Sequence, residues 1–221
     1  MFKKLIFSFL LIASSGAANA ALITQSDSVT RQDTDISTSL VFDMFNLGTG
    51  FELTKVTFSI DGDVFGRARV ESEDAAPSVI DIELKVTLTL FDPSNNDLVI
   101  SIPLFTQSFN ATAFDGSTDF GGTSGISFND LNVSKFESES YTDAATLNAF
   151  TGPGTISLDF TGIAETSASG AGNITASFST QASGDVEVIY EYRAVEVSEP
   201  SMVALFGLGL IALGCSRRIK K

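Results

Sequence analysis

The sequence predicts an all-β fold: a single antiparallel β-sandwich, with a jelly roll as its main variant, between an N-terminal signal peptide and a short C-terminal hydrophobic helix. Three observations favour it. Apolar and polar residues alternate with period two in many stretches, glycine-rich or polar turn clusters separate these stretches, and most of the 19 Phe residues occupy the apolar positions or the leader. About eight to ten strands are expected from this pattern.

The clearest strand is predicted over residues 79–90. Its even-numbered positions are all Ile, Leu or Val, and the positions between them are Asp, Glu, Lys and Thr. Such alternation indicates a half-buried strand with one solvated face. The turn cluster DPSNND follows at residues 92–97, so residues 98–109 are expected to return as the second arm of a hairpin. Pro103 favours a sheet edge or a bulge in that arm.

Shorter stretches of the same alternation predict the other strands. Residues 51–60 and 64–70 are expected to be two strands joined by a turn at Asp61, Gly62 and Asp63. A short helix is expected over residues 142–150, with Thr142 or Asp143 as its N-terminal cap. Later strands are expected around residues 156–160, 174–178 and 186–192.

The composition excludes several kinds of chemistry. The chain has no His and no Trp, and its one Cys, Cys215, lies in the C-terminal apolar stretch. Residues 21–195 therefore have no Ser-His-Asp triad, no Cys nucleophile, no Cys or His metal ligand and no disulfide. No charged block or Pro/Ser-rich linker divides these residues, so one domain is expected there, and we expect it not to be an enzyme.

Charge is distributed unevenly along the chain. Six of the 13 Lys and Arg residues lie in the two ends, which leaves seven against 26 acidic residues and a net charge of −19 over residues 21–198. A domain this acidic repels nucleic acid and anionic lipid, stays soluble and attracts divalent cations. Nucleic acid is therefore not an expected partner.

Residues 1–20 are predicted to be a signal peptide. Lys3 and Lys4 precede a short apolar core at residues 5–13, and Ala18 and Ala20 form a small-x-small cleavage site. Signal peptidase is therefore expected to leave Ala21 as the first residue after export. The alternative is an uncleaved membrane helix, for which the apolar run is short.

The opposite end has three parts. Residues 197–201 include Ser198, Glu199, Pro200 and Ser201; residues 202–215 are apolar; and residues 216–221 are basic, through Arg217, Arg218, Lys220 and Lys221. A helix over residues 202–215 would span about 21 Å, which is short of the roughly 30 Å hydrocarbon core. The basic end would stay cytoplasmic. Such a segment suits a pause in the membrane followed by cleavage, and an ordinary membrane anchor is the alternative.

This tail, residues 196–221, resembles the PEP-CTERM sorting signal, whose pattern is a Pro-Glu-Pro motif, a short apolar helix and an Arg-rich end. Glu199 and Pro200 match the motif, and Ser198 stands in place of its first proline. The resemblance implies an exosortase-type sorting enzyme as partner, cleavage near the motif and a link to exopolysaccharide or biofilm matrix.

Most of residues 22–193 resemble the choice-of-anchor domains of bacterial surface proteins, most nearly the type E group. The likeness rests on VFDMF at 41–45, LTKVTF at 53–58, GTSGI at 122–126, FTGPGTI at 150–156 and GNITASFST at 172–180. Such domains occur with different C-terminal sorting tails, which implies an exported module. The family implies no catalytic residues for this chain.

Calcium is the one metal that the polar clusters are suited to bind, through carboxylate and carbonyl oxygens. The candidate ligands are Asp61, Asp63, Asp92 and Asp97, with Asn95, Asn96, Asp115 and Asp119 in similar clusters. No stretch matches the twelve-residue EF-hand loop, and the same residue types are ordinary in turns. No other cofactor is expected.

The leading hypothesis is a non-enzymatic structural or adhesive module of the cell surface or biofilm matrix, exported and held in the membrane transiently or permanently at its C-terminus. The first alternative is a carbohydrate-binding module, which a concave sheet face with convergent polar groups would favour, although Trp is absent and Tyr occurs only at 141, 190 and 192. A glycoside-acting enzyme, which needs two carboxyls facing each other across a deep groove, is a distant alternative. The expected partners are the export machinery, signal peptidase, exosortase, the membrane and exopolysaccharide.

Overall fold

The computed structural model describes residues 20–170 and 172–195, and strands make up 72% of them. This part of the chain contains nine strands and one short helix, in the order β1 Ala21–Asp33, β2 Ile36–Asp43, β3 Phe51–Ser72, β4 Ser78–Phe91, β5 Asp97–Ser101, β6 Leu104–Ala111, β7 Gly125–Tyr141, α1 Ala144–Ala149, β8 Thr155–Gly170 and β9 Ile174–Ala194. The all-β prediction is confirmed. The predicted signal peptide and C-terminal hydrophobic helix lie outside the described residues.

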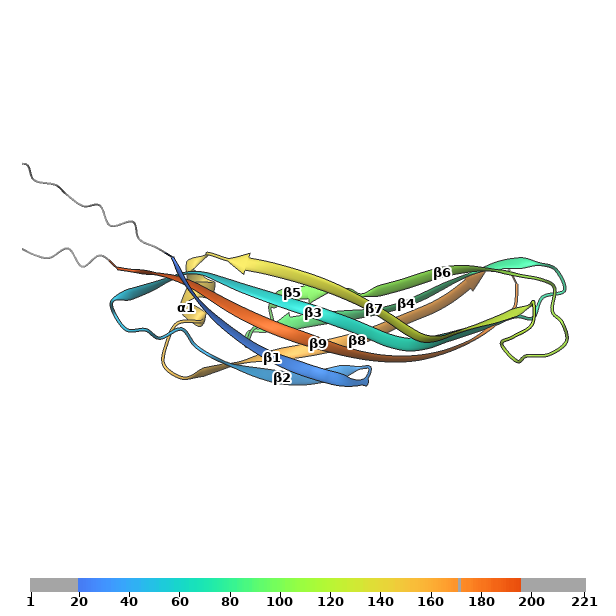
Figure 1. Ribbon diagram of the computed structural model, residues 1–221, viewed down its shortest axis with the longest axis horizontal. Helices are drawn as coiled ribbons and strands as arrows, with labels where there is room; N and C mark the ends of the chain where they lie inside the picture. Colours follow the sequence, from blue (N-terminus) through green and yellow to red (C-terminus); the bar gives the residue numbers. More distant parts are fainter. Residues whose placement is uncertain (1–19, 171, 196–221) are drawn as a thin grey trace, which may run out of the picture.

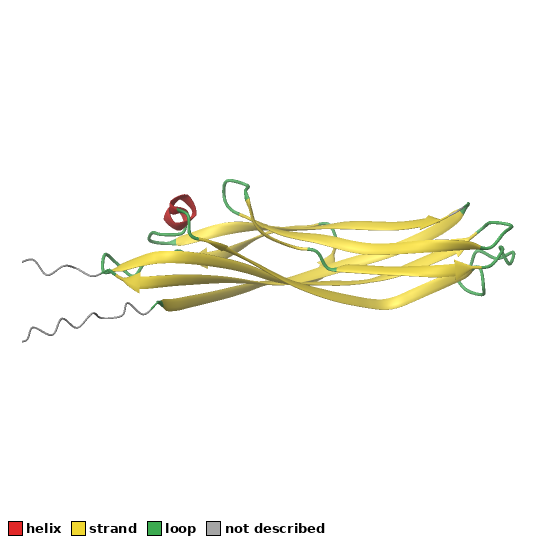
Figure 2. Ribbon diagram, turned by 90° about the horizontal axis from the view of Figure 1, so that it is seen from above, coloured by secondary structure: helices red, strands yellow, loops and turns green. Residues whose placement is uncertain are grey.

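The strands form two antiparallel sheets that pack face to face as an elongated sandwich (Figure 1). The four-stranded sheet, sheet A, has the order β1-β9-β3-β7, and the five-stranded sheet, sheet B, begins β2-β8-β4. Both β5 and β6 pair with the free side of β4, β5 near its C-terminal end and β6 along its N-terminal half. Seen from above, long strands run most of the length of the molecule in both layers (Figure 2). The predicted antiparallel sandwich is confirmed.

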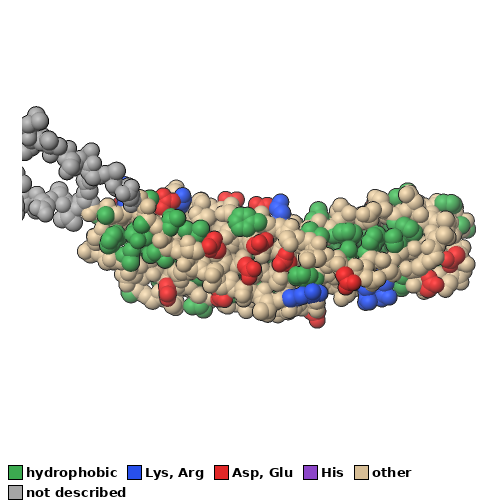
Figure 3. Space-filling model, in the orientation of Figure 1, with side chains coloured by type: hydrophobic (Ala, Val, Ile, Leu, Met, Phe, Trp, Pro, Cys, Tyr) green, Lys and Arg blue, Asp and Glu red, His purple; other side chains and the backbone are tan. Residues whose placement is uncertain are grey.

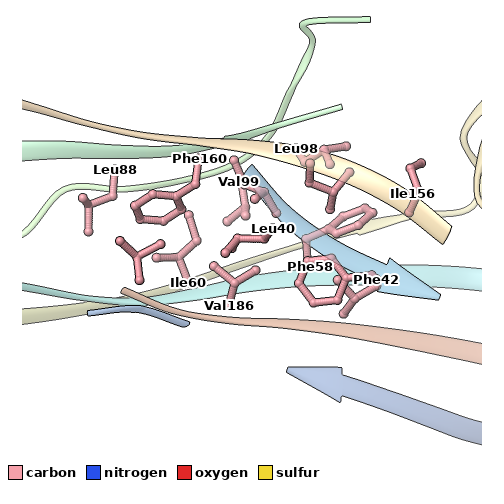
Figure 4. Packing of buried hydrophobic residues seen from close by; sticks show 14 of the residues in the cluster. Leu40, Phe42, Phe58, Ile60, Leu88, Leu98, Val99, Ile156, Phe160 and Val186 are labelled. Carbon is pink, nitrogen blue, oxygen red and sulfur yellow. The ribbon is translucent and has the colours of Figure 1, made fainter. Parts of the chain in front are cut away.

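The core lies between the sheets and follows the alternation seen in the sequence. All six even-numbered residues of β4, from Ile80 to Leu90, are buried. Leu84 to Leu90 belong to the larger core cluster, with apolar residues of β2, β3, β8 and β9 (Figure 4), and Ile80 and Ile82 belong to a smaller cluster with Ala68 and Val70 of β3. Burying each such side chain contributes about 1.5–3 kcal/mol, against which the conformational entropy of ordering the chain acts.

The predicted hairpin after β4 is confirmed, with a break in its second arm. β5 ends at Ser101 and β6 begins at Leu104, so the strand is interrupted around Pro103. The Pro103 carbonyl still accepts a hydrogen bond from the Val86 N–H, at 3.3 Å. Because proline has no N–H to donate, this position at the edge of sheet B is one that a strand tolerates.

The predicted turn at residues 61–63 is wrong. β3 runs without a break through these residues, and Asp61 pairs with Asp185 of β9 and Phe136 of β7. Gly62 lies on the inner face, where a Cβ atom would be 2.3 Å from Leu88 Cδ1 of the opposite sheet. The glycine is therefore needed for close packing between the sheets, not for a change of chain direction.

The predicted helix is confirmed as α1, and it lies beside the end of β7 (Figure 1). Its N-cap is Asp143, whose carboxylate accepts a hydrogen bond from the Thr146 N–H at 2.9 Å. This bond is the main cause of the lowered pKa of Asp143, since it stabilises the charged form.

Candidate functional site

The first and last described segments meet at one end of the sandwich. β1 begins beside the end of β9, where Ala21 pairs with Tyr192 (Figure 1). Val195, which follows β9, donates its N–H to the Gly50 carbonyl at 2.9 Å. The predicted signal peptide and the sorting tail are therefore joined to the same end of the domain.

The predicted processing residues fall at or beyond these two points. Ala20 is exposed directly ahead of β1, which starts at Ala21, and Ala18 lies outside the described residues. The sorting-motif residues Ser198, Glu199, Pro200 and Ser201 and the basic residues Arg217, Arg218, Lys220 and Lys221 also lie outside them. Among the residues that are described, none forms a helix long and apolar enough to cross a membrane.

A polar groove of about 410 Å³ lies on the outer face of sheet B. Because the even-numbered residues of β4 point into the core, Asp81 and Glu83 point outward between β6 and β8. Asp81 is flanked by Ser108 and Ser169, and the Ser108 hydroxyl donates to its carboxylate at 2.6 Å. The remaining lining residues are Ile82, Thr106, Gln107 and Ser167.

The groove is suited to hydrogen bonding with a hydroxyl-rich ligand. Its two carboxylates, Asp81 and Glu83, lie side by side on one strand and do not oppose each other across a cleft. Its lining residues include no aromatic ring and no cation. Lys85, two residues after Glu83 on β4, forms an ion pair with Glu165 of β8. The hydrogen bond to the Glu165 carboxylate raises the pKa of Lys85.

Four carboxylates form an acidic belt across the outer face of sheet A: Asp61, Asp63, Asp185 and Glu187 (Figure 3). Asp63 accepts hydrogen bonds from the hydroxyls of Ser134 and Ser183. The calcium candidates Asp61 and Asp63 thus lie together on a flat strand face. Over residues 20–170 and 172–195, no three acidic, His or Cys side chains converge as a metal ion requires.

Of the other calcium candidates, Asp92 lies in the turn between β4 and β5, and Asp97 is the first residue of β5. The Asp92 carboxylate accepts hydrogen bonds from the Ser94 N–H and from both the backbone and the side chain of Asn96. Burial by itself would raise the pKa of Asp92, but these hydrogen bonds outweigh it and lower that pKa. The Asp92 oxygens therefore close the turn.

Sequence reasoning missed one buried acidic residue, which lies near the end of the sandwich opposite to the one where β1 begins and β9 ends. Glu71 of β3 is fully buried; its Oε2 accepts the Phe120 N–H at 2.7 Å, and the Arg69 guanidinium lies 5.0 Å from the Phe120 ring centre. Neither Glu71 Oε1 nor Arg69 Nε has a hydrogen-bond partner within the described part of the chain. A Cβ on Gly125 would be 2.1 Å from Glu71 Oε2.

Alternation alone places Glu71 on the outer, solvated face of β3. It is buried because the connection between β6 and β7 folds over it, and a period-two pattern does not reveal such a contact. Gly125 is the signal that was available, since a residue without a Cβ lets the backbone approach the Glu71 carboxylate closely.

Comparison with known proteins identifies the tail. Residues 196–218 match the PEP-CTERM protein-sorting motif. No curated protein matches the chain. A T=1 particle structure derived from infectious bursal virus shares 14% identity over 82% of this chain and 37% of that chain, with a TM-score of 0.24. The VP2 subviral particle of infectious bursal disease virus shares 15% identity over 82% of this chain and 38% of that chain, with a TM-score of 0.21.

The chain thus spans less than two fifths of the length of these two viral chains, and TM-scores this low carry no inference about its fold or function. The fold and the tail together define an exported β-sandwich protein that is handled at the cell envelope. More particularly, the PEP-CTERM motif indicates an extracellular protein that is sorted by exosortase.

Proposed function

We propose that this chain is a non-enzymatic structural module of the bacterial surface or biofilm matrix, displayed away from the membrane during sorting. One observation carries the proposal: β9 leads directly from the core of the sandwich into the sorting motif, at the same end as β1. A strand as long as β3, which has 22 residues, extends about 70 Å. The far end of the sandwich would therefore stand well clear of the point of attachment.

Two further features support this proposal. The composition offers no His and no Cys in residues 21–195, and the groove carboxylates lie side by side on one strand. The resemblance of residues 22–193 to choice-of-anchor domains fits a display module that is combined with a sorting tail. Before cleavage, residues 202–215 would hold the protein in the membrane, with the basic residues 216–221 on the cytoplasmic side.

The test is the intact mass of the protein recovered from medium and from membranes of a bacterium that has an exosortase. We expect loss of residues 1–20 and a second cut near Glu199 and Pro200. The matched control is a Glu199→Gln, Pro200→Ala double variant, which should keep residues 202–221 and stay in the membrane fraction. A wild-type chain that keeps its tail in the same strain would contradict the sorting step.

A second function is favoured by the polar groove on sheet B, which would bind polysaccharide through Asp81, Glu83 and the neighbouring hydroxyls. The test is retention of the protein on polysaccharide from its own host. An Asp81→Asn, Glu83→Gln variant should be retained less. An Asp61→Asn, Asp63→Asn variant, which removes the same charge from the opposite sheet, should be retained like wild type. Equal retention of all three proteins would count against the groove.

A further inference from the structure

Four apolar side chains are exposed at the end of the sandwich where the described chain begins and ends. Leu22 is 63% exposed, and Leu47, Phe51 and Val195 are each 42% exposed. Figure 3 shows hydrophobic side chains gathered over this end and acidic side chains along the middle of the same face. We name these four residues the basal patch.

The basal patch is built largely on sheet A. Phe51, at the start of β3, is the backbone partner of Ala194 in β9. Its ring meets the Tyr192 ring edge to face, with 5.7 Å between the ring centres. Val195 is held by its hydrogen bond to Gly50. Strand pairing sets the positions of Leu22 and Phe51, and Leu47 lies in the connection between β2 and β3, so the four exposed side chains lie at one end of the domain.

Ion pairs neutralise the charges beside the basal patch. Arg193 pairs with Glu52 at 2.7 Å, and Lys55 pairs with Glu191, the cross-strand partner of Leu22, at 2.5 Å. In contrast, no ion pair in the described part of the chain involves the acidic belt. Paired charges cost less to bring against a low-dielectric surface than unpaired ones, so on sheet A this end is better suited than the middle to approach lipid.

The chain that follows the basal patch limits its distance from the membrane. Residues 196–201 separate Val195 from the apolar stretch that begins at Met202. Even fully extended, a segment of this length spans about 20 Å. Whenever residues 202–215 are inserted, the end of the sandwich that carries the basal patch must lie within that distance of the hydrocarbon.

We propose that the basal patch rests on the outer face of the membrane while the tail is inserted, and so holds the sorting motif at the lipid surface. This inference rests on the membrane-held stage of the proposed function. The occupant is a lipid surface, because the tether already brings one to this end of the domain. After cleavage the four side chains would act alone, and apolar contact on this scale gives marginal, reversible membrane binding. The cut product would therefore leave the membrane.

The absence of Trp from the chain allows a direct test. The full chain without residues 1–20 is placed in phosphatidylcholine vesicles, with and without lipids brominated near the glycerol backbone. One variant carries Phe51→Trp, in the basal patch. Its control carries Phe136→Trp, at a side chain that is 61% exposed beside the acidic belt, far from the tail. We expect bromine to quench the fluorescence of the Phe51→Trp protein at least twice as strongly as that of the control.

Each outcome separates the two proposals. If the protein floats with the vesicles and both variants are quenched equally, the basal patch does not touch lipid, although the inserted tail stands. If the protein does not float with the vesicles, the membrane-held stage is wrong and the inference falls with it. A blue-shifted Phe51→Trp spectrum without quenching would mean that a second copy covers the patch, which also overturns the inference. Should Phe51→Trp fail to fold, Leu22→Trp reports on the same end of the domain.

Discussion

Asp61 of β3 and Asp185 of β9 are direct cross-strand partners on the outer face of sheet A. Asp63 and Glu187 flank them, and no Lys or Arg pairs with any of the four within the described part of the chain. Like charges placed directly opposite each other destabilise a sheet. A long antiparallel core compensates for this cost, and the charge keeps the surface of an exported domain soluble.

Replacing one of these two carboxylates should therefore stabilise the fold. We expect Asp185→Asn to raise the free energy of unfolding by about 0.5–1 kcal/mol, as measured by urea denaturation at pH 7. The gain should shrink in about 1 M salt, where screening acts within roughly 3 Å. A variant that is less stable than wild type at low salt would show that the repulsion has no net effect.

Enlarging Gly62 should destabilise the core. A Cβ at this position would collide with Leu88 Cδ1, and Leu88 has little room to move because it is fully buried in the core. We expect Gly62→Ala to lower the free energy of unfolding by about 1–3 kcal/mol.

The matched control is Gly50→Ala, because a Cβ at Gly50 meets nothing within 4 Å. Equal effects of the two substitutions on the urea midpoint would rule out the packing explanation.

Removal of the Glu71 carboxylate should loosen the connection between β6 and β7. Glu71→Ala leaves the Phe120 N–H without its acceptor, which costs about 1–3 kcal/mol for a buried group. Hydrogen exchange at the Phe120 amide should become faster. Glu71→Gln keeps an acceptor oxygen and should protect the amide better than Glu71→Ala. Unchanged exchange in Glu71→Ala would show that this hydrogen bond does not hold the connection in place.

The turn between β4 and β5 should contribute to pH-dependent stability. The pKa of Asp92 is lowered from its ordinary value of 3.8, so its contribution is present above that pH and is lost as the pH falls through the folded-state pKa. Asp92→Asn should therefore lose less stability than wild type between neutral pH and about pH 3. Urea midpoints at the two pH values measure this, and a larger loss in the variant would contradict it.

Much of the sandwich was predictable from local pattern. The alternation of β4, the hairpin interrupted at Pro103 and the helix capped by Asp143 all depend on residues close together in the sequence. The sorting motif was recognisable for the same reason, because an apolar stretch between a Pro-containing motif and a basic end is contiguous. The groove on sheet B was not predicted, since it requires β6 and β8 to lie on either side of β4.

By itself, the sequence determined the all-β class, the alternating core and the exported, exosortase-sorted character of the chain, because each depends on residues that are close together in the sequence. The tertiary structure alone decided what Gly62 and Glu71 do. Asp61, Gly62 and Asp63 have the composition of a turn, yet packing against Leu88 makes them the middle of a strand. Glu71 lies on the polar side of its strand, yet a distant connection buries it. Contacts between residues far apart in the chain outweigh local preference at both positions.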